Sequence, residues 1–511
     1  MNKSKMTILL ALAALFLVGL VVARPLLPVD ETRYLSVAWE MHLSGDPFHL
    51  TRNFESYAHK PPLLFWVINL VWLFTGVSEF AARLVGPGFA ILCLWATVRM
   101  GRTIWPGQAE QPGGLVLAGF SLFAIYGSAV MFDAMLTLAV VIGAMFLWRA
   151  GQSEGSWRDW AGLGLALGVG VLAKGPVVLL HLVPMMVLIR LWEQGRAPWR
   201  RHLQGMILAL TTALLVAAVW LVPILLTTDP AFRHELFWTQ SVARVQGGMR
   251  HDRPFWFLLA LLPLLMFPWG WIPGVWRGLP SAIRADRGMR FLAIWAISAP
   301  ILFSLIASKQ LHYLLPELPA VALMMGRYLQ AGPARRLSFA PWVGLAVAAA
   351  VMIAPFSGIP NFPEGMTGPL LLVAGGALAL LSVMALRLPL VAGHLILGAG
   401  MVAVLHLLGA FSGVFVEFDA QRIADELPSS ADGVALVGMP YNAEFSFIGR
   451  LEGPVAFPEG QTQLVAWAHD HPHGVILGVV GHMPITAQPQ MQLRYNGRLM
   501  GFWPAAALAG D

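Results

Sequence analysis

Long apolar runs recur along most of the chain, and they constrain its fold more than any other feature. The first run, MTILLALAALFLVGLVVA, follows the basic start MNKSK. Further runs have about 17 to 25 residues, the length of helix that crosses a hydrocarbon core of about 30 Å. They lie at 80–101, 113–131, 133–149, 160–176, 177–192, 204–226, 255–276, 291–307, 312–328, 338–356, 368–386 and 390–415. The pattern predicts an α-helical polytopic membrane protein with about 13 membrane spans.

The composition supports the same class. Of the 511 residues, 57% are hydrophobic and only 12% are charged, whereas a soluble chain of this length needs a more polar surface. The net charge of +6 would suggest nucleic-acid binding only if the basic residues gathered on a soluble face, which they do not. Cys93 is the single cysteine, so no intramolecular disulfide forms. We therefore expect membrane lipids, and no nucleic acid, as partners.

The arginines predict the orientation of the spans. Arg24-Pro25 after the first run is a poor context for signal cleavage, so we expect an uncleaved first span that enters from the cytoplasm. From that start, every second turn is basic, as cytoplasmic turns are. The arginines of these turns are Arg99, Arg102, Arg149, Arg158, Arg190, Arg196, Arg200, Arg201, Arg277, Arg284, Arg287, Arg290, Arg327, Arg335, Arg336 and Arg387. An odd number of spans then places the C-terminus on the outer side.

The predicted outer face collects the other ionisable residues. The long segment 24–79 carries Asp30, Glu31 and Arg33 directly after the first span, and later outer turns contain Asp133 and Lys309. Ionisable groups near a membrane are costly and usually functional. Within this segment, residues 61–76 (PPLLFWVINLVWLFTG) are short and aromatic, which predicts a helix lying at the membrane interface.

The end of the chain changes character after about residue 416. GVALVGM, EFSFIG, GPVAF, GVILGVVG and QLRYNGRLMGFW are short β-type runs separated by turn residues, and 419–428 predicts a short amphipathic helix. We predict a transmembrane domain over 1–416 and a small external α/β domain over 417–511. The sequence HDHPH at 469–473 raises a zinc reading, but two histidines flanking a proline better fit a solvated turn.

The outer face lies away from cytoplasmic nucleotides, so a group transferred there must arrive already activated. A sugar on a polyprenyl phosphate is such a donor. Its transfer needs a carboxylate for the acceptor, cations for the leaving phosphate and an apolar groove for the isoprenoid tail. Asp30 and Glu31 are the candidate carboxylates, with Asp133 supporting them. The candidate cations are Arg33, Lys60, Arg244 and Lys309, and the aromatic helix at 61–76 suits the tail.

Several segments resemble one known family. DETRYLSVAWEMHLSGDPF and HKPPLLFWVINLVWLFTGVSEFAARL closely match the first external loop of the dolichyl-phosphate-mannose protein mannosyltransferase superfamily. The similarity continues through FDAMLTL, GVLAKGP, FWTQSVARVQGGMRHDRPFWFLL and SKQLHYLLPELPA, in the family's order. The chain looks most like the bacterial aminoarabinose transferases, which modify lipid A. The resemblance implies the GT-C fold, many spans with an external C-terminal domain, in a bacterial inner membrane.

Carried over residue by residue, the resemblance implies roles for six side chains. It makes Asp30 the catalytic carboxylate and Asp133 a second acidic residue of the site. It makes Arg33 and Lys60 ligands of the lipid phosphate, with Tyr57 and Tyr313 nearby. The implied reaction is an inverting glycosyl transfer at the periplasmic face, from a polyprenyl-phosphate sugar to lipid A, lipopolysaccharide, a related glycan or a protein.

One departure from the family bears on metal binding. The resemblance implies a glutamate before the Lys-Pro-Pro and a histidine in the later external loop, two residues that together can hold a metal. Here His59 and Gln240 stand at those positions. Loss of the carboxylate weakens a site for a hard metal, and an amide is a poor zinc ligand. We therefore predict no metal ligands, and we count no cofactor as certain, with a divalent ion as the alternative.

Other functions fit the sequence less well. Protein O-mannosyltransferase-type transfer uses the same fold and remains an alternative acceptor chemistry. A transporter or flippase of lipid-linked sugars would place charges near the bilayer midplane within inverted repeats, whereas here the charges lie at one surface. An assembly protein would act through its external tail, which has no charged cluster. The sequence thus favours a glycosyltransferase, without naming its sugar.

Overall fold

The computed structural model describes residues 3–107, 112–153, 155–239, 252–330, 337–357, 365–427, 433–483 and 487–508. The chain divides into two compact units. The first unit contains residues 1–22, 58–64 and 83–408, and the second contains 23–57, 65–82 and 409–511. The second unit therefore joins segments of the predicted first external loop to the C-terminal part of the chain.

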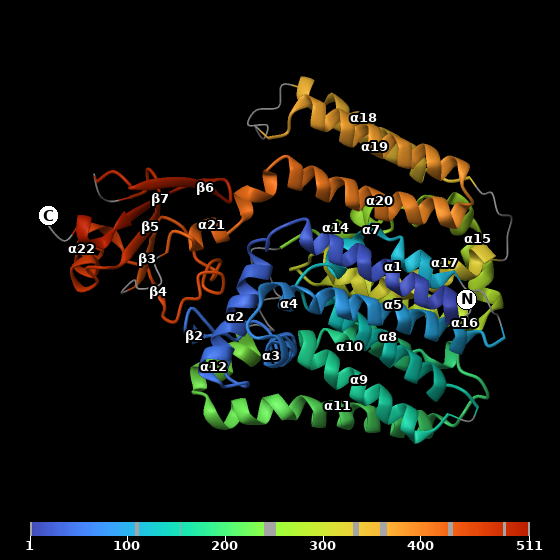
Figure 1. The fold of residues 1–511 in the computed structure, drawn as a ribbon. Coiled ribbons are helices and arrows are strands. Elements are labelled where there is room, and N and C mark those ends of the chain that lie inside the picture. Colours follow the sequence, from blue (N-terminus) through green and yellow to red (C-terminus); the bar gives the residue numbers. More distant parts are fainter. Residues whose placement is uncertain are drawn as a thin grey trace. The chain divides into compact units, whose positions relative to one another are not determined.

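The first unit is a bundle of helices that run mostly along one direction (Figure 1). Its α-helices are α1 (Lys3–Val22), α5 (Val85–Ile104), α6 (Gly113–Ala118), α7 (Ser121–Gly127), α8 (Asp133–Ala150), α9 (Trp157–Lys174), α10 (Val178–Val187), α11 (Trp199–Thr227), α12 (Pro230–His234), α14 (Phe257–Leu265), α15 (Pro273–Ala285), α16 (Arg287–Leu305), α17 (Leu318–Gln330), α18 (Ala340–Ile353), α19 (Gly368–Arg387) and α20 (Leu390–Phe411). Short 3₁₀ turns are η1 (Ile189–Leu191), η3 (Trp269–Trp271), η4 (Leu311–Glu317) and η5 (Ala354–Phe356), and η2 (Glu235–Thr239) is a π-helical turn.

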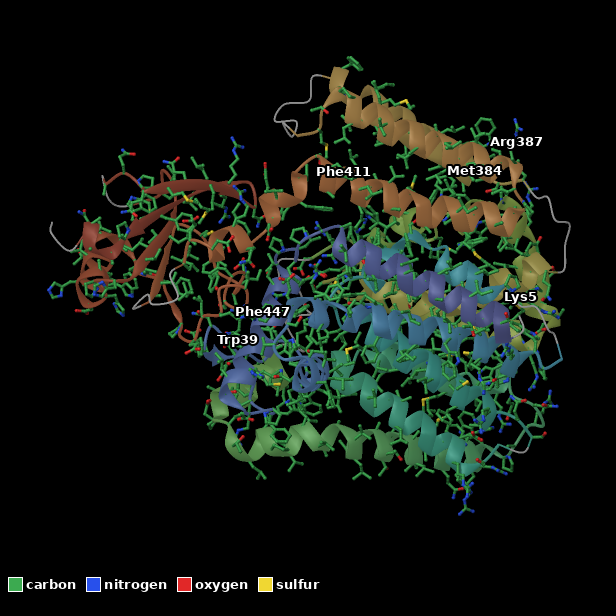
Figure 2. All side chains as sticks on the ribbon, in the orientation of Figure 1. Lys5, Trp39, Met384, Arg387, Phe411 and Phe447 are labelled. Atoms are coloured by element: carbon green, nitrogen blue, oxygen red, sulfur yellow. The ribbon has the colours of Figure 1, made fainter. Side chains whose placement is uncertain are left out.

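Seven helices in the described part of the chain are long and apolar enough to cross a membrane. Figure 2 shows Lys5 of α1 and Arg387 of α19 at the same end of this unit. The outward side chains of α11, among them Leu214, Leu215 and Leu226, are exposed. Exposed leucines along a long helix fit a lipid environment. The predicted multi-pass membrane fold is confirmed, but the count of about 13 spans is not, because several predicted spans are not single helices.

The predicted span 113–131 is wrong as one helix, since it forms α6 and α7 with a break at Gly119 and Phe120. The break lies tightly against other elements: a Cβ added to Gly398 would lie 2.0 Å from the Gly119 carbonyl oxygen. Ser121 donates its backbone N–H to Phe267 and its hydroxyl to the Gly398 carbonyl, at 3.3 and 3.0 Å. Neighbouring elements thus pair backbone groups that a continuous helix would pair itself, which is what permits a break at membrane depth.

Three more predicted spans are divided in the same way. The run 255–276 becomes α14, η3 and the start of α15, because Pro268 and Pro273 lack the N–H that a helix interior needs. The run 177–192 ends in η1, and the run 312–328 begins as η4. Hydropathy reports how apolar a segment is, but it does not report where its backbone hydrogen bonds are made.

The second unit combines helices of the first external loop with a small sheet. The loop elements are α2 (Asp30–Ser44), the two-residue strands β1 (Thr51–Arg52) and β2 (Glu55–Ser56), α3 (Leu63–Thr75) and α4 (Glu79–Arg83). The C-terminal elements are η6 (Val414–Phe418), α21 (Gln421–Ala424), β3 (Val434–Val437), β4 (Val455–Ala456), α22 (Gly460–Asp470), β5 (Val475–Val479), β6 (Met491–Tyr495), β7 (Arg498–Pro504) and η7 (Ala505–Ala507). A helix is present within 61–76, as predicted.

The sheet has the strand order β4-β3-β5-β7-β6. Strand β3 pairs in parallel with β4 and β5, while β7 pairs antiparallel with β5 and β6. Asn496 and Gly497 both have positive φ, as the tight turn between β6 and β7 requires. The predicted small α/β domain is confirmed, although the helix expected over 419–428 is limited to the four residues of α21.

One predicted strand is wrong. The run EFSFIG (444–449) forms turns instead of a strand, although Phe445 and Phe447 are buried. The Ala443 carbonyl and the Phe447 N–H pair with the side chain of Ser36 on α2. A side chain 407 residues away in the sequence therefore takes the place of a neighbouring strand, and no local pattern reports such a partner.

Candidate active site

Helix α2 carries a connected group of polar side chains at its first turns. The Asp30 carboxylate accepts a hydrogen bond from the Tyr34 hydroxyl at 3.0 Å, and the Arg33 guanidinium forms an ion pair with the same oxygen, Oδ1. The spacings of three and four residues bring these side chains to one face of the helix. The side chain of Asp30 remains 41% exposed. Asp30 is thus an oriented carboxylate with one oxygen turned to protein partners and room at the other.

The surroundings of Arg33 keep its charge. Burial alone would lower the pKa of Arg33, but Tyr57, Tyr34 and Asp30 outweigh that effect and raise the pKa above its ordinary value. Burial and the charge of Asp30 raise the pKa of Tyr34 well above its usual range, so Tyr34 stays a hydrogen-bond donor. The predicted residues Asp30, Arg33 and Tyr57 are therefore brought together. Tyr34 was not predicted as a site residue. Its position four residues after Asp30, on the same face of a helix, was the signal that could have identified it.

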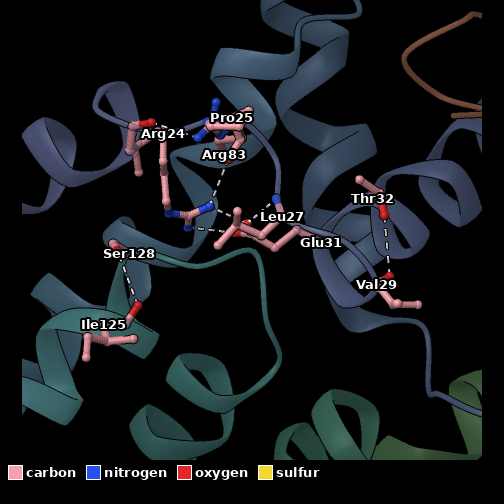
Figure 3. A network of polar contacts seen from close by, with 10 residues as sticks. Arg24, Pro25, Leu27, Val29, Glu31, Thr32, Arg83, Ile125 and Ser128 are labelled. Atoms are coloured by element: carbon pink, nitrogen blue, oxygen red, sulfur yellow. Dashed lines mark hydrogen bonds and ion pairs between the residues drawn. The ribbon is translucent and has the colours of Figure 1, made fainter. Parts of the chain in front are cut away.

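Glu31 has a different environment from its neighbour. Its carboxylate forms a two-pronged ion pair with Arg24, with Arg24 Nη2 2.9 Å from Glu31 Oε1, and it also accepts the Leu27 N–H at 3.0 Å (Figure 3). The side chains of Arg24 and Glu31 are 4% and 5% exposed. A charge buried this deeply needs such a partner. Glu31 was predicted as a catalytic candidate beside Asp30, and the structure places it in a closed pair that holds the start of α2.

In the first unit, Asp133 and Lys174 form a second buried ion pair. Lys174 Nζ lies 2.5 Å from Asp133 Oδ1, and their side chains are 8% and 1% exposed, respectively. Asp133 is the first residue of α8 and Lys174 is the last residue of α9. The positive end of one helix dipole thus faces the acid and the negative end of the other faces the lysine, which stabilises both charges. Gly175, with φ +80°, ends α9 directly after this lysine.

Aromatic rings and a second lysine surround this pair. The Lys174 ammonium lies 4.9 Å from the centre of the Tyr313 ring, and the Lys60 ammonium lies 5.7 Å from the centre of the Phe132 ring. Cations over ring faces are stabilised where water is scarce. Lys60, Asp133 and Tyr313 were predicted and lie at this cluster. Lys174 was missed as a site residue, although its position in a predicted outer turn pointed to it.

Two further predicted cations differ in their placement. Lys309 is buried, and its ammonium donates to the carbonyls of Arg253, Pro254 and Ser304 at 3.1, 3.2 and 3.1 Å. An ammonium has three donors, and these three carbonyls use all of them. In this conformation Lys309 therefore stabilises the backbone at residues 253–254. Arg244 lies outside the described residues.

The metal position of the family is changed in this chain. His59 Nε2 lies 3.7 Å from Glu235 Oε1, and Gln240 lies outside the described residues. Within the described ranges, no group of three or more histidine, cysteine or acidic side chains is arranged to hold a metal ion. Two half-exposed side chains do not form a closed metal site, so we assign no step of a reaction to a metal.

An apolar groove runs along the first unit. It has a volume of about 510 Å³ and lies between α10 and α16, with η1 and α15 at its end. Its lining includes Pro184, Leu188, Ile294, Ile297 and Ile301. Such a groove between apolar helices suits a long hydrocarbon chain.

Comparison with known proteins supports the resemblance seen in the sequence. The family described as dolichyl-phosphate-mannose-protein mannosyltransferase matches residues 59–223. The crystal structure of ArnT from Cupriavidus metallidurans bound to undecaprenyl phosphate matches the whole chain, with a TM-score of 0.79 and 19% sequence identity over 100% of both chains. The chain therefore has the fold of this ArnT structure, as the sequence predicted. The match at residues 59–223 agrees with the superfamily that the sequence resembles.

Curated relatives lie in the bacterial branch that the sequence predicted. The undecaprenyl phosphate-alpha-4-amino-4-deoxy-L-arabinose arabinosyl transferase of Pseudomonas aeruginosa PAO1 is 31% identical over 316 residues, which cover 59% of this chain and 55% of the relative. The protein of the same name from Edwardsiella ictaluri is 31% identical over 340 residues, which cover 62% and 59%. The chain thus matches somewhat more than half the length of these relatives.

Proposed function

We propose that this protein is an inverting glycosyltransferase. It moves a sugar from a polyprenyl-phosphate donor to an envelope acceptor, which is lipid A, lipopolysaccharide or a related glycan. A pentosyl or hexosyl group fits the proposal equally. The names of these relatives, arabinosyl transferases that use an undecaprenyl phosphate-linked sugar, support a polyprenyl-phosphate donor and favour transfer over transport.

The orientation and exposure of the Asp30 carboxylate are the observation that supports the proposal. Its carboxylate is oriented by Tyr34 and Arg33 but remains 41% exposed. In the proposed reaction, Asp30 takes the proton from the acceptor hydroxyl as the acceptor oxygen bonds to the anomeric carbon of the sugar. The bond between that carbon and the phosphate oxygen breaks on the opposite face, and polyprenyl phosphate leaves. If the acceptor is an ionised phosphate, no proton moves and Asp30 organises the attack.

Arg33 and Lys60 are the proposed phosphate ligands. The Arg33 guanidinium uses Nη2 on Asp30, and its buried Nε has no hydrogen-bond partner among the residues that the structure describes. A buried donor without a partner is costly, and a phosphate oxygen would satisfy it with a charge-assisted bond. Tyr57 lies beside this guanidinium. Asp133 and Lys174 support the cluster in the first unit, while Lys309 and Arg244 remain weaker candidates.

The groove between α10 and α16 is the proposed path of the isoprenoid tail. His181 lies one turn before Pro184 of the groove and packs against Phe303, which packs against Tyr313. Tyr313 in turn lies beneath Lys174. A chain of side-chain contacts within one unit thus runs from the groove to the cationic cluster. Helix α3, with exposed Leu70, Leu73 and Phe74, is the second candidate surface.

The proposed location is the bacterial inner membrane, with the N-terminus cytoplasmic and the candidate site and C-terminal sheet in the periplasm. The alternation of the arginine-rich turns supports this orientation. Cys93 is the only cysteine and is buried, so the native chain is a suitable background for single added cysteines. Labelling Ser44→Cys and Ser281→Cys with a membrane-impermeant maleimide tests the orientation. Reaction at Ser281→Cys in intact spheroplasts would contradict it.

The test of the function is Asp30→Asn, with Asp46→Asn as the matched control. Asp46 belongs to the same external loop, is exposed and accepts only local backbone N–H groups. Mass spectrometry of envelope lipids from cells with and without the protein identifies the sugar and acceptor, and purified variants are then assayed with that pair. With a hydroxyl acceptor we expect Asp30→Asn to lose roughly 10²–10⁴ in rate and Asp46→Asn to be unchanged. A folded Asp30→Asn variant with wild-type turnover would contradict the role of Asp30.

A further inference from the structure

Helix α2 has two functional faces. At about 100° of rotation per residue, Asp30, Arg33 and Tyr34 point to one side of the helix axis. Trp39 points to the opposite side, and Ser36 lies between the two sides, about 120° from Asp30. Both hydrogen bonds to Asp30 come from α2 itself, as far as the described residues show. The direction of the carboxylate therefore depends on how the whole helix is rotated, and the contacts of its other sides contribute to that rotation.

Ser36 attaches α2 to the C-terminal part of the chain. Its hydroxyl donates to the Ala443 carbonyl at 2.7 Å and accepts the Phe447 N–H at 3.1 Å. The residue is completely buried. One turn later, Trp39 Nε1 donates to the Leu451 carbonyl at 2.9 Å. Three backbone groups of segment 443–451 thus bind two consecutive turns of α2, which fixes the helix against both sliding and rotation.

A second attachment continues from the end of α2. The Glu40 carboxylate accepts the N–H groups of Asn53 and Phe54 at 2.7 and 2.8 Å, and both residues have left-handed φ angles. The Asn53 side chain then binds the backbone of Val455 twice, donating to its carbonyl at 3.1 Å and accepting its N–H at 2.8 Å. Val455 begins strand β4. The sheet is therefore connected to α2 through Glu40 and Asn53.

Aromatic packing reinforces the same attachment. The Trp72 ring of α3 stacks on the Phe447 ring with centres 5.4 Å apart and planes 10° apart, and Trp39 meets Phe447 edge to face at 6.5 Å. Figure 2 labels Trp39 and Phe447, which lie next to each other. The Arg450 guanidinium lies 4.0 Å from the centre of the Phe447 ring. Segment 443–455 thus packs closely against α2 and α3.

We propose that the C-terminal segment 443–455 sets the rotation of α2 and thereby aims Asp30 at the acceptor, with Ser36 as the central positioning residue. This inference rests on the proposed function, because it concerns the carboxylate that acts there. It gives the C-terminal sheet a role in catalysis instead of a separate binding role. A displacement of a reacting group by about 1 Å costs on the order of 10² in rate, so a modest rotation of α2 is sufficient to affect turnover.

The experiment compares Ser36→Ala with Ser44→Ala. Ser44 lies at the exposed end of the same helix and bonds only locally. For Ser36→Ala we expect kcat to fall at least about tenfold with the KM for the lipid donor within about twofold, and for Ser44→Ala we expect no change. Hydrogen–deuterium exchange should rise in α2 and in 443–455 of Ser36→Ala. Unchanged kcat and unchanged exchange would overturn the inference.

A double-mutant comparison separates positioning from a general loss of folding. In an Asp30→Asn background the carboxylate is no longer present to be aimed, so Ser36→Ala should cost less than about threefold there. Equal losses in both backgrounds would overturn the positioning role while leaving the proposed function intact. Full activity of Asp30→Asn alone would instead overturn the proposed function. If Ser36→Ala does not fold, Trp39→Phe carries the same test, because it keeps an aromatic ring at this position and removes the Nε1 donor that binds the Leu451 carbonyl.

Discussion

Asp30 and Glu31 are adjacent carboxylates, and the structure predicts opposite consequences of neutralising them. Glu31→Gln removes the charge that balances Arg24 in a pair whose side chains are 4% and 5% exposed. Breaking a buried pair by removing one partner costs about 3–5 kcal/mol, because the remaining charge stays buried. Asp30→Asn removes an ion pair in which the Asp30 side chain is itself 41% exposed, and exposed pairs contribute about 0–1 kcal/mol.

The magnitudes lead to a clear separation of stability from activity. Glu31→Gln should lower the free energy of unfolding by about 3–5 kcal/mol, and the surviving folded fraction should keep much of its turnover. Asp30→Asn should unfold within a few degrees of the wild type, yet lose most of its activity. Thermal unfolding in detergent, followed by tryptophan fluorescence, gives the first quantity, and transfer from the lipid donor gives the second.

A charge-neutral control tests the origin of the effect. Replacing both partners, as Arg24→Met with Glu31→Leu, leaves no uncompensated buried charge and should recover part of the lost stability. The reasoning would be refuted by a Glu31→Gln protein that is as stable as the wild type and inactive, with Asp30→Asn unstable but active. That outcome would make Glu31 the catalytic carboxylate and Asp30 the residue that stabilises the fold.

Three further predictions concern the candidate site and the helix packing. Arg33→Ala and Lys60→Ala should raise the KM for the lipid donor roughly 10- to 150-fold, since a charge-assisted contact contributes about 1.5–3 kcal/mol, and unchanged KM values in both would exclude the phosphate role. Asp133→Leu should strongly lower the unfolding temperature by leaving Lys174 buried without its partner, and adding Lys174→Met should recover part of the loss; an unaltered melting curve of Asp133→Leu would contradict this. Transfer activity should survive EDTA, since the described residues contain no cluster of three metal ligands, and complete loss restored by one divalent ion would contradict that expectation.

Much of the site was accessible from the sequence because its parts are local. Asp30, Arg33 and Tyr34 are three and four residues apart, so a helix beginning near residue 30 necessarily places them on one face. The outer position predicted for Asp133 followed from counting apolar runs. The choice between Asp30 and Glu31 did not follow from spacing, since both are acids in the first turn of the same helix. Only their burial and their partners separate them.

The errors in the fold prediction have a common cause. The divided span at 113–131 and the missing strand at 444–449 both depend on backbone groups whose partners are far away in the sequence, at Phe267 and Ser36 respectively. Apolar composition was read correctly in both segments. A hydrophobic pattern predicts that a segment is buried. The conformation of the segment depends on which groups form hydrogen bonds with its backbone N–H and C=O groups.

The sequence by itself determined the membrane class and the approximate positions of the helices, because the lengths of apolar runs are local properties. Tertiary structure decided which charges are paired and closed and which remain open to a substrate. Arg24 meets Glu31, Lys174 meets Asp133 and Lys309 meets three carbonyls only after the chain is folded. The physical reason is that the cost of a buried charge depends on its neighbours in space, and these neighbours are set by packing between segments far apart in the chain.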